Sequence, residues 1–224
     1  MKELVPVVAI DGFSGAGKSV LSQNISKALK WNLLESGFIY RLVSFIILKN
    51  KLSFDRKNID VIEKKLDSYL NLQNDFFKNY YFINVLKKKL MLHNIVNFAS
   101  EIATLPHIRK FLLHKQRLFR KSPGLVTNGR DMGTVVFPDA VVKIFLYANI
   151  KIRAKRRISE LQNNGINANF NNILSDMQKR DQQDQNRSCC PLSVPKDALI
   201  INSTDINVEA VFNIAISHIN KKLN

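Results

Sequence analysis

Residues 12–19 read Gly12-Phe13-Ser14-Gly15-Ala16-Gly17-Lys18-Ser19 and match the full pattern G-x-x-x-x-G-K-S/T. The apolar run at residues 5–10 predicts a buried strand before them, and residues 19–29 have the pattern of a helix. A strand, a glycine loop and a helix in this order are the context that identifies a phosphate-binding loop. The glycines let several backbone N–H groups surround one phosphate, and the helix adds the positive end of its dipole. The sequence therefore predicts that the chain binds a nucleoside triphosphate.

The side chains of this loop indicate how the triphosphate and a metal ion are held. We expect Lys18 to lie on a solvated loop and to reach the β- and γ-phosphates, and the Ser19 hydroxyl to coordinate Mg²⁺. Asp11, at the end of the strand, is expected near that ion without touching it. The alternative is a glycine-rich turn that fits the pattern by accident. The residues predicted to bind the triphosphate are Gly12, Phe13, Ser14, Gly15, Ala16, Gly17, Lys18, Ser19 and Val20.

Length and composition limit the class of protein. A chain of 224 residues, 46% of them hydrophobic, can bury one α/β core with inserted lobes. No stretch approaches the roughly 18 apolar residues of a membrane helix, and no signal peptide is visible, so we expect a cytoplasmic protein without a membrane partner. Cys189 and Cys190 are adjacent, which predicts reduced thiols, with a redox role as the alternative.

The formal net charge of +16 raises the question of a nucleic-acid partner. No recognition helix, zinc-ligand spacing or aromatic stacking motif of a nucleic-acid module is visible in the sequence. A protein that binds two phosphorylated ligands also needs clustered cations, and solvated surface explains other lysines. We therefore predict small-molecule substrates and no nucleic acid.

Apolar runs and helical patterns alternate along most of the chain. This alternation around a glycine loop predicts an α/β fold, a doubly wound parallel sheet of the P-loop NTPase type, with ligands at the carboxyl ends of the strands. The further strands are expected at residues 31–35 (ending in a turn at Ser36-Gly37), 125–127, 142–146 and 198–201, and the further helices at residues 40–50, within 95–120 with a new helix starting at Pro106, and from Val208.

Residues 51–90 are less regular than the rest. Alternation within residues 80–86 suggests short antiparallel strands, which do not belong in a parallel core. This region is therefore predicted to form an inserted lobe.

Several arginines lie where a phosphate-transfer site would need them, because the arginine fork binds phosphate with two hydrogen bonds. Arg41 and Arg130 follow two of the predicted strands. Arginines at 153, 156 and 157 are spaced to share one helical face, which would point three cations at a common place, although a solvated face is the alternative. Residues 180, 184 and 187 are equally ambiguous between ion pairing along a helix and ligand contact.

Four segments in the same order and spacing resemble the bacterial cytidylate kinases: residues 8–18, 35–41, 129–140 and 180–187. The run Gly129-Arg130-Asp131-Met132-Gly133-Thr134-Val135-Val136-Phe137-Pro138-Asp139-Ala140 is specific to that family, whereas the glycine loop alone indicates only a large superfamily. The resemblance implies transfer of the ATP γ-phosphoryl group to CMP or dCMP. It also implies a single domain over residues 1–224, with a core of residues 1–37, 95–149 and 192–224, a monophosphate-binding insert at about 38–94 and a lid at about 150–191.

The resemblance carries over to individual residues. Monophosphate-binding residues would be Ser36, Tyr40, Arg41, Ser100, Arg109, Arg130, Asp131, Asp184 and Arg187, of which Ser100, Arg109 and Asp131 would meet the cytosine edge. Catalytic residues would be Lys18, Arg130, Arg153, Arg157 and Arg180. The chain departs from the family pattern at Glu35, Asn128, Phe38 and Val20.

Other functions stay open at this point. A kinase for UMP, dTMP or shikimate is the nearest alternative, and a nucleic-acid-stimulated ATPase is the alternative from another class. We expect ATP and Mg²⁺ as cofactors and a monomeric protein.

Overall fold

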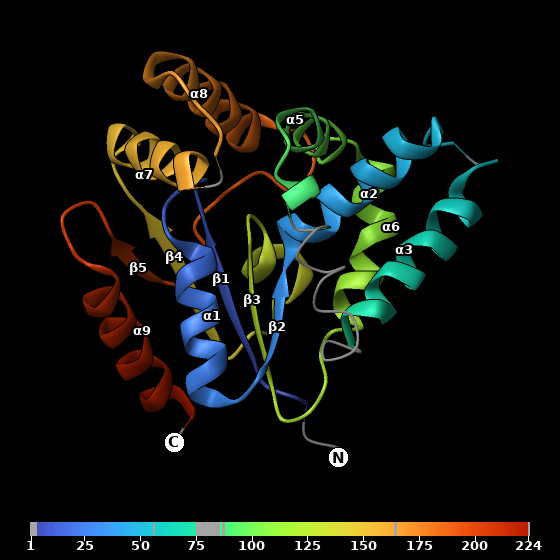
Figure 1. Ribbon diagram of the computed structural model, residues 1–224. Helices are drawn as coiled ribbons and strands as arrows, with labels where there is room; N and C mark the ends of the chain where they lie inside the picture. The colour runs from blue at the N-terminus through green and yellow to red at the C-terminus, as the bar shows by residue number, and fades with distance from the viewer. Residues whose placement is uncertain (1–3, 56, 75–85, 87, 164, 224) are drawn as a thin grey trace. The chain divides into compact units, whose positions relative to one another are not determined.

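The computed structural model describes residues 4–55, 57–74, 86, 88–163 and 165–223 (Figure 1). The chain divides into two compact units. The first is formed by residues up to 36 together with residues from 110 onward, and the second by residues 37–109. The second unit thus continues to Arg109, beyond the position near 94 where the sequence placed the end of the insert. The bounds of an insert and a lid within one domain stay a prediction.

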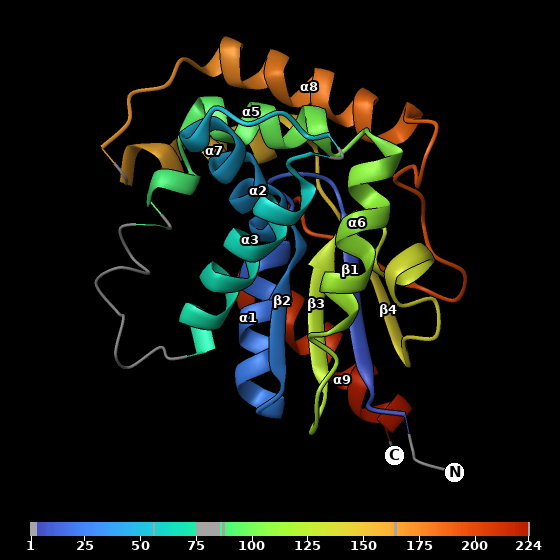
Figure 2. The same cartoon turned by 90° about the vertical axis from the view of Figure 1, so that its right-hand side faces the viewer.

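The first unit is built on a parallel sheet of five strands in the order β2-β3-β1-β4-β5. Figure 2 shows β3, β1 and β4 side by side. The parallel α/β architecture expected from the sequence is confirmed. The strands are β1 (Val7–Gly12), β2 (Asn32–Glu35), β3 (Leu125–Gly129), β4 (Val142–Tyr147) and β5 (Leu199–Asn202).

The sheet is covered on one face by α1 (Lys18–Leu29) and α9 (Val208–Leu223), which pack against each other (Figure 1). Their apolar sides share one core with the strands, including Ile25 of α1, Ala215 of α9 and Ile144 of β4, all of them fully buried. β1 is buried along its whole length because it lies between β3 and β4. The glycine loop therefore starts from the central, fully buried strand of the sheet.

Gly12 ends β1 at a place where no side chain fits. Its φ is +141°, and a Cβ on it would lie 1.9 Å from the carbonyl oxygen of Leu146 on β4. The close approach of these two strands needs glycine here, because real Cβ atoms do not come so near to a backbone oxygen.

Three further helices of this unit lie around the carboxyl ends of the strands. The π-helical turn η1 (Met132–Val136) follows β3, and the neighbouring helices α7 (Ile150–Asn163) and α8 (Phe170–Asn186) follow β4 (Figure 1). The expected turn at Ser36-Gly37 is wrong, since α2 (Ser36–Asn50) begins there directly after β2.

The second unit is helical in the described residues. It contains α2 from residue 37, α3 (Ile59–Asn74), α5 (His93–Ile102) and the start of α6 (Pro106–Arg117), which continues into the first unit. The two helices predicted within 95–120 are confirmed.

The strands expected within residues 51–90 are wrong where α3 runs. Its buried residues Ile62 and Leu66 are four positions apart, which is the spacing of one face of a helix and not the alternation of buried and exposed residues in a strand. Of the segment 80–86, only Leu86 belongs to the described residues, and the strands predicted there lie outside them.

Candidate active site

The glycine loop has the conformation of an anion-binding loop. Gly15 and Gly17 have φ of +73° and +99°, values that glycine adopts without strain. Gly17 is the N-cap of α1, and no side chain caps this helix end. Its first N–H groups therefore point into the loop, where a phosphate can accept from them.

Lys18 is buried, which corrects the expectation of a solvated loop. Its Nζ donates a hydrogen bond of 2.6 Å to the carbonyl of Phe13, across the loop. Burial lowers the pKa of Lys18 well below its ordinary value, and the nearby Arg130 lowers it further, while Asp184 and Asp11 act in the opposite direction. An ammonium group so poorly solvated gains strongly from an anionic partner such as a phosphate.

Asp11 has a structural role that the sequence did not indicate. Its two carboxylate oxygens accept hydrogen bonds from the backbone N–H groups of Met132 (2.8 Å) and Gly133 (2.7 Å). Burial raises the pKa of Asp11 to about 6, although these two hydrogen bonds lower it. The carboxylate thus ties the end of β1 to η1, directly after Arg130 and Asp131. Its place near a metal ion stays a prediction.

Four of the predicted residues lie together in the first unit. Arg130 Nε donates to Asp184 Oδ2 at 2.6 Å. Arg187 approaches two carboxylates, with Nη1 3.7 Å from Asp184 Oδ1 and Nη2 3.8 Å from Asp131 Oδ1. Burial by itself raises the pKa of Asp184, but Arg130, Arg180 and Arg187 hold it below its ordinary range. These residues form a buried, charged cluster, which we call the arginine–aspartate cluster: Arg130, Asp131, Asp184 and Arg187.

The three arginines of α7 do not point at a common place, so that prediction is wrong. Arg153 is buried, and Arg156 donates to the backbone carbonyl and the hydroxyl of Ser203. Arg157 makes an exposed ion pair of 2.7 Å with Glu160 on its own helix. The spacing of the three arginines would place them on one face of the helix, but each side chain contacts a different partner.

Arg153 contacts the glycine loop and holds it in place. Its guanidinium makes two hydrogen bonds to Asp181 of α8, at 3.2 and 2.6 Å, and donates to the carbonyl of Ser14 at 3.1 Å. It also lies over the ring of Phe13, 5.1 Å from the centroid. The pair thus links α7 and α8 to the loop. Asp181 was not among the predicted site residues.

Two other supporting residues were not predicted from the sequence. Gln116 of α6 donates to the Ser36 hydroxyl at 2.9 Å, and both residues are buried. Ser203, just after β5, donates to the carbonyl of Ala16 in the loop at 2.9 Å. A buried glutamine on an amphipathic helix is a weak signal of such a role, and nothing in the sequence marks Ser203.

Arg180 lies on α8 in the first unit, and four other predicted residues, Tyr40, Arg41, Ser100 and Arg109, belong to the second unit. The Arg109 guanidinium lies over the Tyr40 ring, 5.7 Å from its centroid, and donates to the Ala103 carbonyl at 2.9 Å. Arg41 folds back toward Gly37, since a Cβ on that glycine would lie 3.2 Å from Arg41 Nη1. Ser100 is half-buried on α5. Tyr40 and Arg109 therefore form a packed pair within this unit.

Of the departures from the family pattern, Asn128 has a defined place. Its amide donates to the Ser22 hydroxyl of α1 at 2.7 Å, in the core behind the loop. Val20 is exposed on α1. Asn128 therefore anchors α1 to β3 as a neutral hydrogen-bond donor.

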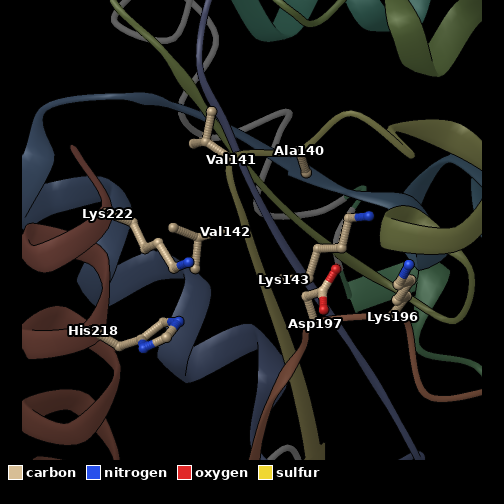
Figure 3. A pocket seen from close by; sticks show the side chains of 8 residues that line it. All are labelled: Ala140, Val141, Val142, Lys143, Lys196, Asp197, His218 and Lys222. Atoms are coloured by element: carbon tan, nitrogen blue, oxygen red, sulfur yellow. The ribbon is translucent and has the colours of Figure 1, made fainter.

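A cavity of about 250 Å³ lies away from these residues, at the start of β4. Figure 3 shows its lining: His218 and Lys222 of α9 lie on the side of Val142, and Lys143, Lys196 and Asp197 lie on the other side of the strand. None of the predicted site residues lines it. The glycine loop follows the opposite, carboxyl end of β1, so this cavity is separate from the candidate site.

Two features are absent from the described residues. No group of three or more histidine, cysteine, aspartate or glutamate side chains could hold a metal ion there. Among the same residues, no helix is both long and apolar enough to cross a membrane.

Comparisons with known proteins agree on one family. The family model for cytidylate kinase matches residues 8–221. The chain is 48% identical to a cytidylate kinase of Buchnera aphidicola subsp. Baizongia pistaciae over 221 residues, 98% of this chain and 96% of that protein. It is 40% identical to a cytidylate kinase of Proteus mirabilis, with 100% of both chains covered. The solved structure of TT1252 from Thermus thermophilus is similar in fold, with a TM-score of 0.50 and 13% identity over 99% of this chain and 100% of that one. The chain belongs to the cytidylate kinase family.

Proposed function

We propose that the protein transfers the γ-phosphoryl group of ATP to CMP or dCMP, giving ADP and CDP or dCDP. As a member of its family it is a nucleoside monophosphate kinase with ATP as the phosphoryl donor. The observation that supports this reaction best is the arginine–aspartate cluster beside Lys18: Arg130 and Asp184 both act on the pKa of that lysine. Two anionic substrates brought together need such buried cations.

The reaction asks little covalent chemistry of the protein. The acceptor phosphate is already anionic near neutral pH, so no strong general base is needed, and catalysis rests on positioning and charge neutralisation. In this scheme Lys18, Arg130 and Arg180 stabilise the transferred group. Arg153, which holds Ser14 and Phe13 of the loop, is a positioning residue. The role of Arg157 near the triphosphate stays a prediction, since it pairs with Glu160.

The proposed reaction requires Mg²⁺. Ser19 is exposed at the first turn of α1, next to the uncapped loop, and its hydroxyl would hold the ion, as in phosphate-binding loops generally. The ion would neutralise charge on the β- and γ-phosphates. Removal of divalent cations with EDTA should abolish turnover, and added Mg²⁺ should restore it.

Acceptor choice is proposed to rest on Asp131, together with Ser100 and Arg109. A carboxylate accepts a hydrogen bond from the 4-amino group of cytosine, whereas uracil presents a carbonyl oxygen to the same carboxylate. Such an unpaired contact costs about 1–3 kcal/mol, so CMP should be preferred over UMP by at least ~10-fold in kcat/KM. Ser36, Tyr40, Arg41, Arg130, Asp184 and Arg187 are proposed to bind the phosphate and sugar.

A panel of acceptors in a coupled ADP assay tests the proposal. CMP and dCMP should be phosphorylated well, and UMP, dTMP and shikimate poorly. Asp131→Asn should lose activity with CMP yet discriminate less against UMP, because an amide can also donate. Arg109→Ala is the matched control and should weaken both pyrimidines. Equal use of CMP and UMP by the wild type would overturn the assignment of Asp131.

A further inference from the structure

Two adjacent thiols follow α8 in the first unit. The Sγ atoms of Cys189 and Cys190 are 3.2 Å apart, and both side chains are half-buried and reduced. A disulfide bond is about 2.05 Å long, so a relative movement of about 1 Å brings the two sulfurs to bonding distance. An oxidant reaching this partly exposed pair would find the second thiol already in place.

The backbone of Cys190 links this pair to the arginine–aspartate cluster. Its φ is +54°, in the left-handed region that residues with a Cβ rarely adopt. In this conformation its carbonyl oxygen accepts a 2.5 Å hydrogen bond from Arg187 Nε. The orientation of the Cys190 carbonyl and the position of the Arg187 guanidinium therefore depend on each other.

Arg187 has little room to move independently. Its side chain is 3% exposed, and its two Nη atoms lie near Asp184 and Asp131. The Cys190 carbonyl is the acceptor that orients the Nε edge of the fork, while the Nη edge faces the two carboxylates. A shift of that carbonyl would rotate the Arg187 guanidinium, and this group is proposed to bind CMP.

We propose that Cys189 and Cys190 are an oxidative modification site: a hydroperoxide converts them to a disulfide, and closure of this ring weakens CMP binding through Arg187. The second part rests on the proposed function. In the first step one thiolate attacks the peroxide oxygen, the O–O bond breaks, and a sulfenic acid forms. The second thiol then displaces the sulfenic oxygen as water. With hydrogen peroxide, two thiols give one disulfide and two molecules of water, and a dithiol reductant reverses the change.

The covalent geometry of neighbouring residues explains why the ring would act on Arg187. Consecutive Cα atoms are about 3.8 Å apart, less than the 4.4 Å at which the usual disulfide range begins. The peptide that joins the two cysteines must therefore distort when the ring closes, and this displaces the Cys190 carbonyl. A disulfide formed under such constraint is also reduced easily, which suits a reversible change.

Intact mass measures the first part of the proposal without reference to activity. After treatment with hydrogen peroxide the wild type should lose the mass of two hydrogen atoms and recover it with dithiothreitol. The variant Cys189→Ser, which keeps one thiol, should not show this loss. If the wild type gains the mass of oxygen without losing two hydrogen atoms, the proposed disulfide is wrong.

Kinetics measure the second part. Oxidised wild type should show a KM for CMP raised about fivefold, the effect of one lost hydrogen bond, with the KM for ATP nearly unchanged. Dithiothreitol should reverse the change, and Cys189→Ser treated in the same way should keep its KM for CMP.

Arg187→Ala separates the two ways in which the link can fail. If it raises the KM for CMP but oxidation of the wild type does not, the link between the cysteines and Arg187 is wrong. If Arg187→Ala leaves the KM for CMP unchanged, the role of Arg187 in the proposed function is wrong, and so is the link to the cysteines. The mass measurement still decides whether the disulfide forms.

Discussion

Lys18 is a buried cation whose ammonium group donates a hydrogen bond to a backbone carbonyl of its own loop, that of Phe13. Lys18→Ala should lower kcat by about 100- to 1,000-fold or more, the scale of removing one preorganised donor to the transition state. The fold should survive, because the lost group is a poorly solvated charge rather than an apolar contact. Steady-state kinetics and a thermal melt measure the two effects. Lys27→Ala, on the exposed last turn of the same helix, should keep both near normal.

Asp11 predicts a dependence of stability on pH. Its folded pKa of about 6 lies above the ordinary value of 3.8, so between these values the folded state holds the proton and the unfolded state does not. The contribution of Asp11 to stability is therefore full below about pH 4 and is lost as the pH rises to about 6. Asp184 acts in the opposite sense, since its lowered pKa adds stability above 3.8 that is lost on acidification.

Urea unfolding at pH 4.5 and pH 7 tests this for Asp11. Relative to Asp11→Asn, the wild type should lose about 2 kcal/mol of unfolding free energy between pH 4.5 and pH 7. The exposed Asp205 supplies the control, and Asp205→Asn should parallel the wild type. Parallel curves for Asp11→Asn and the wild type would contradict the burial of a carboxyl at this position.

The charged residues of the candidate site were named from sequence motifs, whereas the residues that support them were not. Arg130 and Asp184 belong to two separate motifs, and the structure brings them together although they are 54 residues apart. The supports bridge long separations: Ser36 and Gln116 are 80 residues apart, and Ala16 and Ser203 are 187. No spacing or period encodes such pairs, because they exist only after the sheet has assembled.

Helices α7 and α8 are joined by a buried ion pair that reaches the loop. Asp181→Asn should cost roughly 3 kcal/mol of unfolding free energy, because it leaves the Arg153 charge buried without a counter-charge. It should also raise the KM for ATP, since Arg153 holds the Ser14 carbonyl.

The chain provides its own control for this change. Glu160→Gln removes the exposed ion pair of Arg157 on α7 and should cost no more than about 1 kcal/mol. Chemical denaturation measures both variants. Equal losses for the two would mean that Arg153 does not depend on Asp181.

Elements were predicted where local signals are strong. The strands are apolar runs, and Pro106 marks the start of α6 as expected. The π-helical turn η1 could not be predicted, because its N–H groups are held by Asp11, which is 121 and 122 residues away. The order of the sheet, with β1 in the middle, likewise depends on pairings between distant segments.

The net charge of +16 belongs to the whole molecule and predicts non-specific attraction to polyanions. RNA should be retained at about 50 mM salt and released by about 200 mM. Turnover of ATP should depend on CMP and should not increase with added RNA at either salt concentration. A coupled ADP assay with and without RNA distinguishes the kinase from a nucleic-acid-stimulated ATPase, for which RNA alone would raise turnover. The predicted monomer is checked by analytical ultracentrifugation in the same buffers.

The contact between Gly12 and the Leu146 carbonyl also has a genetic consequence. A single base change that alters the amino acid of a glycine codon gives either a stop codon or a residue with a Cβ, and at this position any Cβ would lie 1.9 Å from a backbone oxygen. Every missense mutation at codon 12 should therefore push the central strand away from its neighbour, however small the new side chain. In a mutational scan this codon should tolerate synonymous changes alone, in contrast to that of the nearby exposed Val20.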